Sequence, residues 1–205
     1  MPANNAFGNY RERCARVFDE SRTLLGDEQE RWLAKNLANC TSTWNVMASP
    51  GPFLPFSYAH DGKDLRYIGA WDIYPANRKR VADALLGNRD SHPLILSGDV
   101  HSFWALDGRD VPDADERFAV TEFVTSSISA NWPEPLARRV TENLAHNPQV
   151  SFYEPDRRGY LLHDVSAGEW KTTMRALEDV EDQQSPAFDL ATFIVDAGKP
   201  GFRRI

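Results

Sequence analysis

The feature that most constrains the fold of this chain is a short apolar run at residues 93–97, with the sequence PLILS. A strand with one buried face alternates apolar and polar residues, whereas this run is almost continuously apolar, which indicates a strand buried on both faces. Strands of that kind occur in sheets that helices cover. The run therefore predicts an α/β fold.

The residues before this run alternate between helix and strand signals. Asp27 is an expected acidic N-cap with Glu30 three residues on, and apolar residues then recur at three- and four-residue spacing over residues 32–40, which predicts a helix there. A strand is expected at residues 43–48. A second helix is expected from Pro75, a residue suited to the first helical position, to a stop at residues 87–88. Helix, strand, helix, strand is the pattern of an α/β sandwich.

The rest of the chain is organised around this pattern. A proline-rich irregular loop is expected at residues 49–65, and its aromatic residues argue against disorder. In the second half we expect a helix at residues 134–145 and strands at residues 118–125, 160–165, 170–177 and 191–195. The predicted regions are a loosely attached lead-in at residues 1–25, a main region at residues 26–177, and an acidic linker with a C-terminal tail at residues 178–205.

Composition excludes two classes of partner. The chain of 205 residues has 23 Lys and Arg against 30 Asp and Glu, a formal net charge of −7. Binding to a phosphate backbone needs clustered positive charge, so nucleic acid is not expected. No apolar run approaches the ~18–20 residues of a membrane span, and the opening MPANN does not resemble a secretory signal. We expect no membrane partner, a cytoplasmic chain as given, and free thiols at Cys14 and Cys40.

The strongest chemical signal directly follows the apolar run, where the sequence reads GDVH at residues 98–101. Ligands of open α/β sheets bind at the carboxyl ends of the strands, which places Asp99 and His101 at the expected edge of a site. Carboxylate oxygen and imidazole nitrogen suit Zn, Fe or Mn. The alternative is that Asp99 caps a turn and His101 is a core histidine, because an Asp-x-His triplet by itself is a weak pattern.

A metal site needs more ligands than these two. One catalytic metal takes about three protein ligands, and a two-metal site takes roughly six. Asp72 is the best further candidate because it lies just before a helix start and between two aromatic residues; an ordinary acid near a helix N-terminus is the equal alternative. The other histidines are expected to be structural or exposed: His60, His92, His146 and His163.

Six ordered blocks of this sequence resemble those of PhoD-type alkaline phosphatases. The first two are RTLLGDEQERWL at residues 22–33 and WNV at residues 44–46. The next two are AWDIYP at residues 70–75, followed by Arg78 and Arg80, and SGDVHS at residues 97–102. The series closes with VTEFVTSSIS at residues 120–129 and with Asn147-Pro148, Phe152-Tyr153 and Arg158-Gly159-Tyr160. The resemblance spans residues 22–177.

The resemblance implies a calcineurin-like metallophosphoesterase fold, a two-sheet α/β sandwich with a metal centre at the strand ends. It implies metal-dependent hydrolysis of phosphate monoesters and diesters, with Fe, Ca, Zn or Mn ions that neutralise charge on the phosphoryl oxygens. His101 is then an expected metal ligand, and Asp99 is expected to be a ligand or an acid that supports one. Asp72 and Tyr74 are expected to face the site with them as catalytic residues, with Asp72 as a third ligand. Arg78 is expected to make either a phosphate contact or a structural contact. Members of the family are often exported.

The sequence departs from the family's pattern before residue 22. The superfamily's other ligands come from an Asp-x-His block, a Gly-Asp block and a Gly-Asn-His or Gly-Asn-Asp block upstream of that point, and only 21 residues precede it here. Asp90-Ser91-His92 has the letters of the first block but stands before its strand. We therefore expect a C-terminal half with the N-terminal half missing, weakly active or inactive alone, and active when a second polypeptide supplies the rest.

A second class of function is open as well. A noncatalytic interaction module would keep the fold without the chemistry, and would self-associate or bind a partner through exposed sheet edges and apolar surface. The candidates for such a surface are Trp71, Trp104 and Trp132. Serine hydrolysis through Ser126, Ser127 or Ser129 is not expected, because no Gly-x-Ser-x-Gly turn accompanies them.

Overall fold

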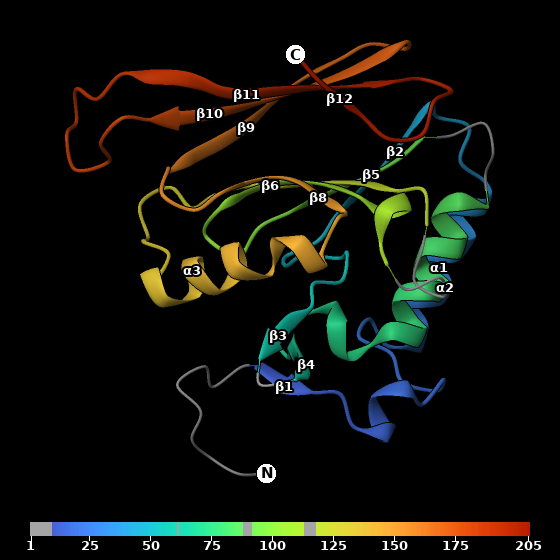
Figure 1. Ribbon diagram of the computed structural model, residues 1–205. Helices are drawn as coiled ribbons and strands as arrows, with labels where there is room; N and C mark the ends of the chain where they lie inside the picture. Colours follow the sequence, from blue (N-terminus) through green and yellow to red (C-terminus); the bar gives the residue numbers. More distant parts are fainter. Residues whose placement is uncertain (1–9, 61, 88–91, 113–117) are drawn as a thin grey trace.

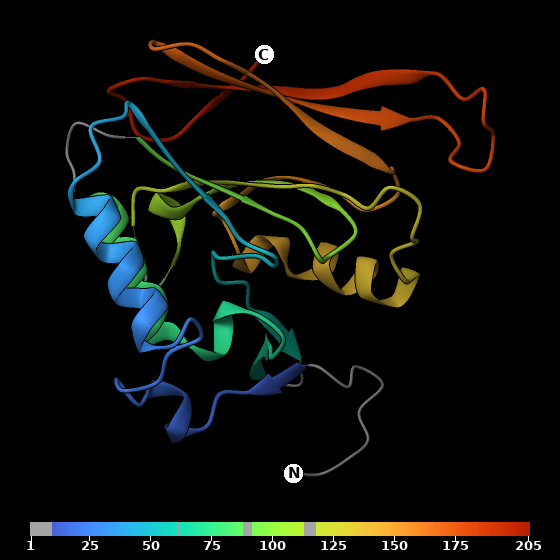
Figure 2. The same ribbon diagram turned by 180° about the vertical axis from the view of Figure 1, so that it is seen from behind.

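The computed structural model describes residues 10–60, 62–87, 92–112 and 118–205, and these residues form three sheets and three α-helices (Figure 1). Two sheets face each other, and the helices lie on the other side of the larger one (Figures 1 and 2). A small third sheet lies near the N-terminal end, below the helices in Figure 1. In the part of the chain that the structure describes, no helix combines the length and the apolar character needed to cross a membrane.

The five-stranded sheet holds the predicted apolar strand in its interior. Its strands, in spatial order, are β2 (Trp44–Ala48), β5 (His92–Ser97), β7 (Thr121–Val124), β6 (Phe103–Asp107) and β8 (Val150–Glu154). β2, β5 and β7 are parallel, whereas β6 and β8 pair antiparallel with their neighbours. Leu94 and Ile95 of β5 have no exposed surface, which confirms a strand covered on both faces.

The four-stranded sheet is antiparallel and covers one face of the larger sheet. Its order is β12 (Arg203–Arg204), β11 (Ala187–Asp196), β10 (Glu169–Leu177) and β9 (Gly159–Val165). The core between the sheets contains Phe103 and Phe123 from one and Met174 and Phe193 from the other. The acidic residues 178–186 connect β10 to β11. The predicted two-sheet α/β sandwich is confirmed, together with the three strands expected in this region.

Three helices cover the opposite face of the larger sheet: α1 (Asp27–Ala38), α2 (Pro75–Leu86) and α3 (Glu134–Asn143). The core on this side takes Leu37 from α1, Leu85 from α2 and Val140 from α3. The predicted cap at Asp27 is wrong by one residue, because Gly26 is the cap and its carbonyl accepts from the Glu30 N–H at 3.0 Å. The second helix begins at Pro75 as predicted; residue 88 of its expected stop lies outside the described residues.

The third sheet corrects two expectations. Its strands, in order, are β1 (Tyr10–Glu12), β4 (Lys63–Tyr67) and β3 (Tyr58–His60). The lead-in is therefore not loosely attached throughout, and the loop expected to be irregular at residues 49–65 contains β3 and the start of β4. Tyr10 pairs with Tyr67 and packs edge-on against Tyr58, with ring centroids 4.6 Å apart. The burial of aromatic rings from separate segments stabilises these short strands. The sequence of any one segment does not reveal this stabilisation.

Other elements were not expected or were placed differently. Strands β6 and β8 were not predicted. Trp71 and Trp104, candidates for an exposed surface, are each 4% exposed and lie in the core beneath the larger sheet, while Trp132 is partly buried. Cys14 and Cys40 are free thiols. Short 3-10 helices complete the description: η1 (Ala15–Phe18), η2 (Trp71–Ile73), η3 (Gly108–Asp110) and η5 (Leu144–His146).

Candidate functional site

Asp99 and His101 lie in the tight turn between β5 and β6, at the carboxyl end of the parallel strands β2, β5 and β7. Both have a positive φ, 73° for Asp99 and 45° for His101. The left-handed region costs an L-residue roughly 1–2 kcal/mol, although Asp and His enter it more often than most residues. Strain of this kind concentrates at functional sites, so the turn is the leading candidate for one.

The Asp99 side chain is exposed, and in the described segments only one of its two carboxylate oxygens has a hydrogen-bond partner. The Tyr67 hydroxyl, from β4, donates to Asp99 Oδ2 at 3.2 Å. Burial and the neighbouring Asp99 charge raise the pKa of Tyr67 to about 12, so the hydroxyl keeps the proton that it donates. Asp99 Oδ1 has no hydrogen-bond partner among the described residues. The carboxylate therefore keeps one oxygen open for a ligand.

His101 is oriented by the backbone. Its Nδ1 lies 3.2 Å from the carbonyl oxygen of Asn131. A carbonyl only accepts, so Nδ1 carries the proton and donates it. Nε2 is then the nitrogen left to offer a lone pair, which is the arrangement found at metal-binding histidines. Trp132 lies beside the ring, with centroids 6.2 Å apart.

These donors fit part of a metal centre. Asp99 Oδ1 and His101 Nε2 supply one oxygen and one nitrogen, a pair that suits Zn, Fe or Mn. Asp72, the expected third ligand, does not join them. Its Oδ1 accepts from Arg78 Nη1 at 2.8 Å, and its Oδ2 accepts from the Phe56 N–H at 3.3 Å. Among the residues that the structure describes, no group of three or more His, Cys, Asp or Glu side chains could hold a metal ion.

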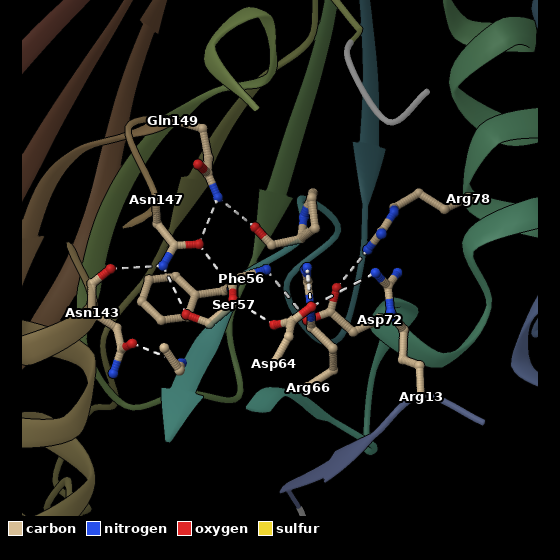
Figure 3. A network of polar contacts seen from close by, with 12 residues as sticks. Arg13, Phe56, Ser57, Asp64, Arg66, Asp72, Arg78, Asn143, Asn147 and Gln149 are labelled. Atoms are coloured by element: carbon tan, nitrogen blue, oxygen red, sulfur yellow. Dashed lines mark hydrogen bonds and ion pairs between the residues drawn. The ribbon is translucent and has the colours of Figure 1, made fainter. Parts of the chain in front are cut away.

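Asp72 and Arg78 form a buried ion pair, which bears on the roles expected for both residues (Figure 3). The Arg78 side chain is 1% exposed and also donates to the Phe53 carbonyl at 3.4 Å, which favours the structural contact over the phosphate contact. In place of the expected ligand role, the structure gives Asp72 a structural one. Tyr74, expected to face the site, is half-buried, and the Arg22 guanidinium lies 4.6 Å from its ring centroid. The contacts described here for Asp72, Arg78 and Tyr74 do not involve Asp99 or His101.

Buried polar side chains fix the proline-rich loop beside the site (Figure 3). Asn147 Oδ1 accepts from the Ser57 N–H at 2.8 Å, and Gln149 Nε2 donates to the Pro55 carbonyl at 2.7 Å. Glu122, which has no exposed surface, accepts from two further N–H groups of the loop. Burial raises the pKa of Glu122 to about 6. These bonds fix the loop in place and satisfy the backbone groups that they reach.

Several residues of the site were missed by sequence reasoning. Tyr67 and Asn131, which hold the two candidate ligands, carry no motif. Glu122 and Arg158 lie in blocks that carry the family resemblance, yet neither was assigned a role. A charged residue inside an otherwise apolar strand, as at Glu122, is a signal that could have marked it.

A groove of about 740 Å³ lies between α1 and α2, and no predicted site residue lines it. Its charged side chains include two ion pairs, Arg80 with Glu30, and Lys79 with Asp83 at 3.1 Å. Paired charges of this kind are typical of a solvated surface. The turn after β5, with its strained backbone and open donors, is the better candidate.

Comparison with known proteins decides the family. A family model described as PhoD-like phosphatase matches residues 2–174. The chain belongs to the PhoD-like phosphatase family. This confirms the assignment expected from the six blocks, and the match includes most of the lead-in that was placed outside the resemblance.

This PhoD-like chain is 31% identical to alkaline phosphatase D of Bacillus subtilis (strain 168) over 187 residues, which are 90% of the chain and 32% of that relative. A solved structure titled "Structure of PhoD" superimposes with a TM-score of 0.80 at 27% identity, over 96% of the chain and 38% of that structure. The chain spans about a third of the length of the curated relative that it matches.

Proposed function

We propose that this PhoD-like chain contributes part of the active site of a metal-dependent phosphate ester hydrolase. The turn after β5 carries the proposal, because it holds two metal-type donors open at the carboxyl end of parallel strands. The family, and the name of the relative, an alkaline phosphatase, support phosphate esters as the substrate class. Metal ions bound there would supply positive charge for the phosphoryl oxygens and would lower the pKa of water.

Within this proposal each side chain has a stated task. His101 binds a metal ion through Nε2 while Asn131 keeps the proton on Nδ1. Asp99 binds through Oδ1 while the Tyr67 hydroxyl holds Oδ2. Arg78 is buried against Asp72 and does not contribute charge to the substrate. In a chain with a formal net charge of −7, the metal ions are then the main source of positive charge at the site.

The proposal also includes a docking site for the polypeptide that supplies the remaining metal ligands. β2 and β9 are edge strands of the two facing sheets, and Val46 and Leu162 on them are 44% and 51% exposed. Trp44 Nε1 donates to the Ser166 carbonyl at 2.7 Å, so both open edges lie on the same side of the sandwich. Open edges with apolar side chains pair readily with another strand.

An added strand parallel to β2 would end beside the candidate site. β2 leads into Gly51, and a Cβ at Gly51 would stand 3.8 Å from Asp99 Oδ2. The carboxyl ends of parallel strands meet at one edge of a sheet, so side chains following the added strand would face Asp99 and His101. We propose as occupant the polypeptide that corresponds to the two thirds or so of the relative that this chain does not match, whether continuous with it or separate.

Hydrolysis of an aryl phosphate tests the site. The chain alone, with Mn²⁺, Zn²⁺, Fe or Ca²⁺ added, is expected to show weak or no turnover, and adding the polypeptide for the unmatched part is expected to restore it. His101→Ala should then lower turnover about 10–100-fold, because a metal ligand is lost. His146→Ala, on the exposed side of η5, is the control and should change nothing. Restored turnover that survives His101→Ala would contradict the site, and strong turnover by the chain alone would contradict the need for a partner.

Lysine substitutions test the docking edge. Val46→Lys and Leu162→Lys are each expected to weaken binding of the unmatched part of the Bacillus subtilis relative about tenfold or more, since a charge cannot be buried at a new strand pair without cost. Ile205→Lys, which follows β12 at the other edge of the four-stranded sheet, is the matched exposed control. Calorimetric titration measures the affinities. Equal affinities for Val46→Lys and Ile205→Lys would show that β2 is not the docking edge. If the chain is instead a noncatalytic module, it would bind in the same way, but His101→Ala would have no effect on turnover.

A further inference from the structure

A buried arginine lies directly behind the candidate site. Arg158, just before β9, is 5% exposed. Its Nη1 donates to the His101 carbonyl and, at 3.0 Å, to Ser126 Oγ. Its Nη2 donates to the Pro155 carbonyl at 2.6 Å. One guanidinium therefore links the turn after β5, the residues after β7 and the connection from β8 to β9.

The acceptors that bind Arg158 are all neutral, so its hydrogen bonds do not neutralise its positive charge. Within the described ranges no carboxylate forms an ion pair with it, and its Nε–H is buried without a partner. Burial lowers the pKa of Arg158, although a guanidinium stays protonated under ordinary conditions. A buried charge without a direct ion pair is costly to the fold, and the nearby charges of Asp156 and Glu154 offset the effect of burial on the pKa of Arg158 only in part. Stability alone therefore does not explain an arginine at this position.

The bond to the His101 carbonyl falls where the backbone is strained. His101 has a φ of 45°, a left-handed conformation that is unfavourable for an L-residue. A hydrogen bond from a charged donor is stronger than one between neutral groups, and it can offset that unfavourable conformation. The direction of the imidazole depends on this backbone conformation, because the Cα–Cβ bond turns with φ. Nδ1 reaches the Asn131 carbonyl from this conformation.

The surroundings of Arg158 are built to hold it in place. The Ser126 hydroxyl accepts from Arg158 and donates to the Arg157 carbonyl at 2.7 Å, so its proton is committed to that carbonyl. Gly159 has a φ of 156°, and a Cβ there would stand 1.9 Å from the Arg175 carbonyl oxygen. Only glycine fits that close approach, and it fixes the direction in which the chain leaves Arg158.

We propose that Arg158 is a positioning residue that holds the His101 turn in the left-handed conformation and so keeps Nε2 presented to a metal ion. The metal part of this inference rests on the proposed function, whereas the conformational part stands without it. Without the guanidinium, the His101 carbonyl loses its charged donor and the residue relaxes toward negative φ. The ring then turns away from the Asn131 carbonyl.

Nuclear magnetic resonance of the full chain tests the conformational part without metal. A residue with positive φ has a short distance between its own amide and Hα protons and gives a strong cross-peak between them. We expect that cross-peak to be strong for His101 in the wild type and weak in Arg158→Gln. Arg139→Gln is the matched control, because Arg139 is 6% exposed but lies on α3, and it should keep the His101 cross-peak.

Titration with Mn²⁺ alone tests the metal part on the same samples. The Mn²⁺ concentration that half-broadens the His101 ring signals is expected to rise about 10–100-fold in Arg158→Gln and to stay unchanged in Arg139→Gln. A weak cross-peak for His101 in the wild type, or a strong one in Arg158→Gln, would overturn the inference. If the cross-peak is lost in the variant but the wild type shows no broadening, Arg158 positions the turn and the proposed metal function fails. If Arg158→Gln does not fold, Arg158→Lys decides on the same signals, since lysine cannot span three acceptors.

Discussion

Replacing Glu122 by alanine is expected to lower the free energy of unfolding by about 3–5 kcal/mol. Glu122 has no exposed surface and accepts from the Phe53 N–H at 2.8 Å, the Leu54 N–H at 2.7 Å and the Ser97 hydroxyl at 2.5 Å. Alanine leaves these buried donors without an acceptor, and each lost acceptor costs about 1–3 kcal/mol. Urea unfolding measures the change. Glu142→Ala, on the exposed side of α3, is the control and should change stability by less than about 0.5 kcal/mol.

Glu122 also makes stability depend on pH. Burial raises its pKa from 4.5 to about 6, so the folded protein binds this proton more tightly than the unfolded chain does. The resulting stabilisation is fully present below pH 4.5 and is lost as the pH rises through about 6, by about 2 kcal/mol. Glu122→Gln cannot titrate. Between pH 4.5 and 7 the wild type should therefore lose about 2 kcal/mol of stability relative to this variant.

The comparison with Glu122→Gln isolates this group. Asp64 and Glu30 have lowered pKa values, in Asp64 because its arginine and serine partners outweigh burial and in Glu30 mainly through Arg80, and they change stability in the opposite direction with pH. They titrate in both proteins, so their contribution cancels in the difference. The amide that Glu122→Gln introduces would leave one of the two loop N–H groups facing a donor, which lowers stability at every pH by about 1–3 kcal/mol. Parallel curves for the two proteins would show that Glu122 does not titrate with a raised pKa.

The elements that sequence reasoning found are those with a clear local period. α1 and β5 follow from spacing and apolar runs that the chain shows within about a dozen residues. β6 was missed although it is buried at every position, because its sequence FWALD has only four apolar residues in a row and ends on an aspartate. The sheet of β1, β3 and β4 was missed for a different reason. β3 and β4 form a local hairpin, but β1 is a strand only because it pairs with β4, more than fifty residues along the chain, as Tyr10 does with Tyr67.

The candidate site divides in the same way. Asp99 and His101 were placed correctly at a strand end because the strand and the turn are contiguous in sequence. Their supports come from far along the chain: Tyr67 is 32 residues from Asp99, and Arg158 is 57 residues from His101. The contacts of Asp72 could not be predicted, because its position between aromatic residues does not reveal that Arg78 and the Phe56 N–H donate to its two oxygens. Whether a carboxylate is free for a ligand depends on its tertiary partners.

Asp72→Asn is expected to lower the free energy of unfolding by about 3–5 kcal/mol, because it removes the negative charge opposite a guanidinium that is 1% exposed. The double variant Asp72→Leu with Arg78→Met should recover much of that loss, since burying two apolar groups avoids the cost of desolvating two charges. Asp83→Asn breaks the exposed pair with Lys79 and is the matched control, expected to cost less than about 0.5 kcal/mol. Urea unfolding of the wild type and these three variants, with Mn²⁺ titration of His101, separates the two roles of Asp72. If Asp72→Asn keeps its stability but loses Mn²⁺ binding, Asp72 is a ligand and the structural role is wrong; loss of stability with retained binding places it among the residues that support the site.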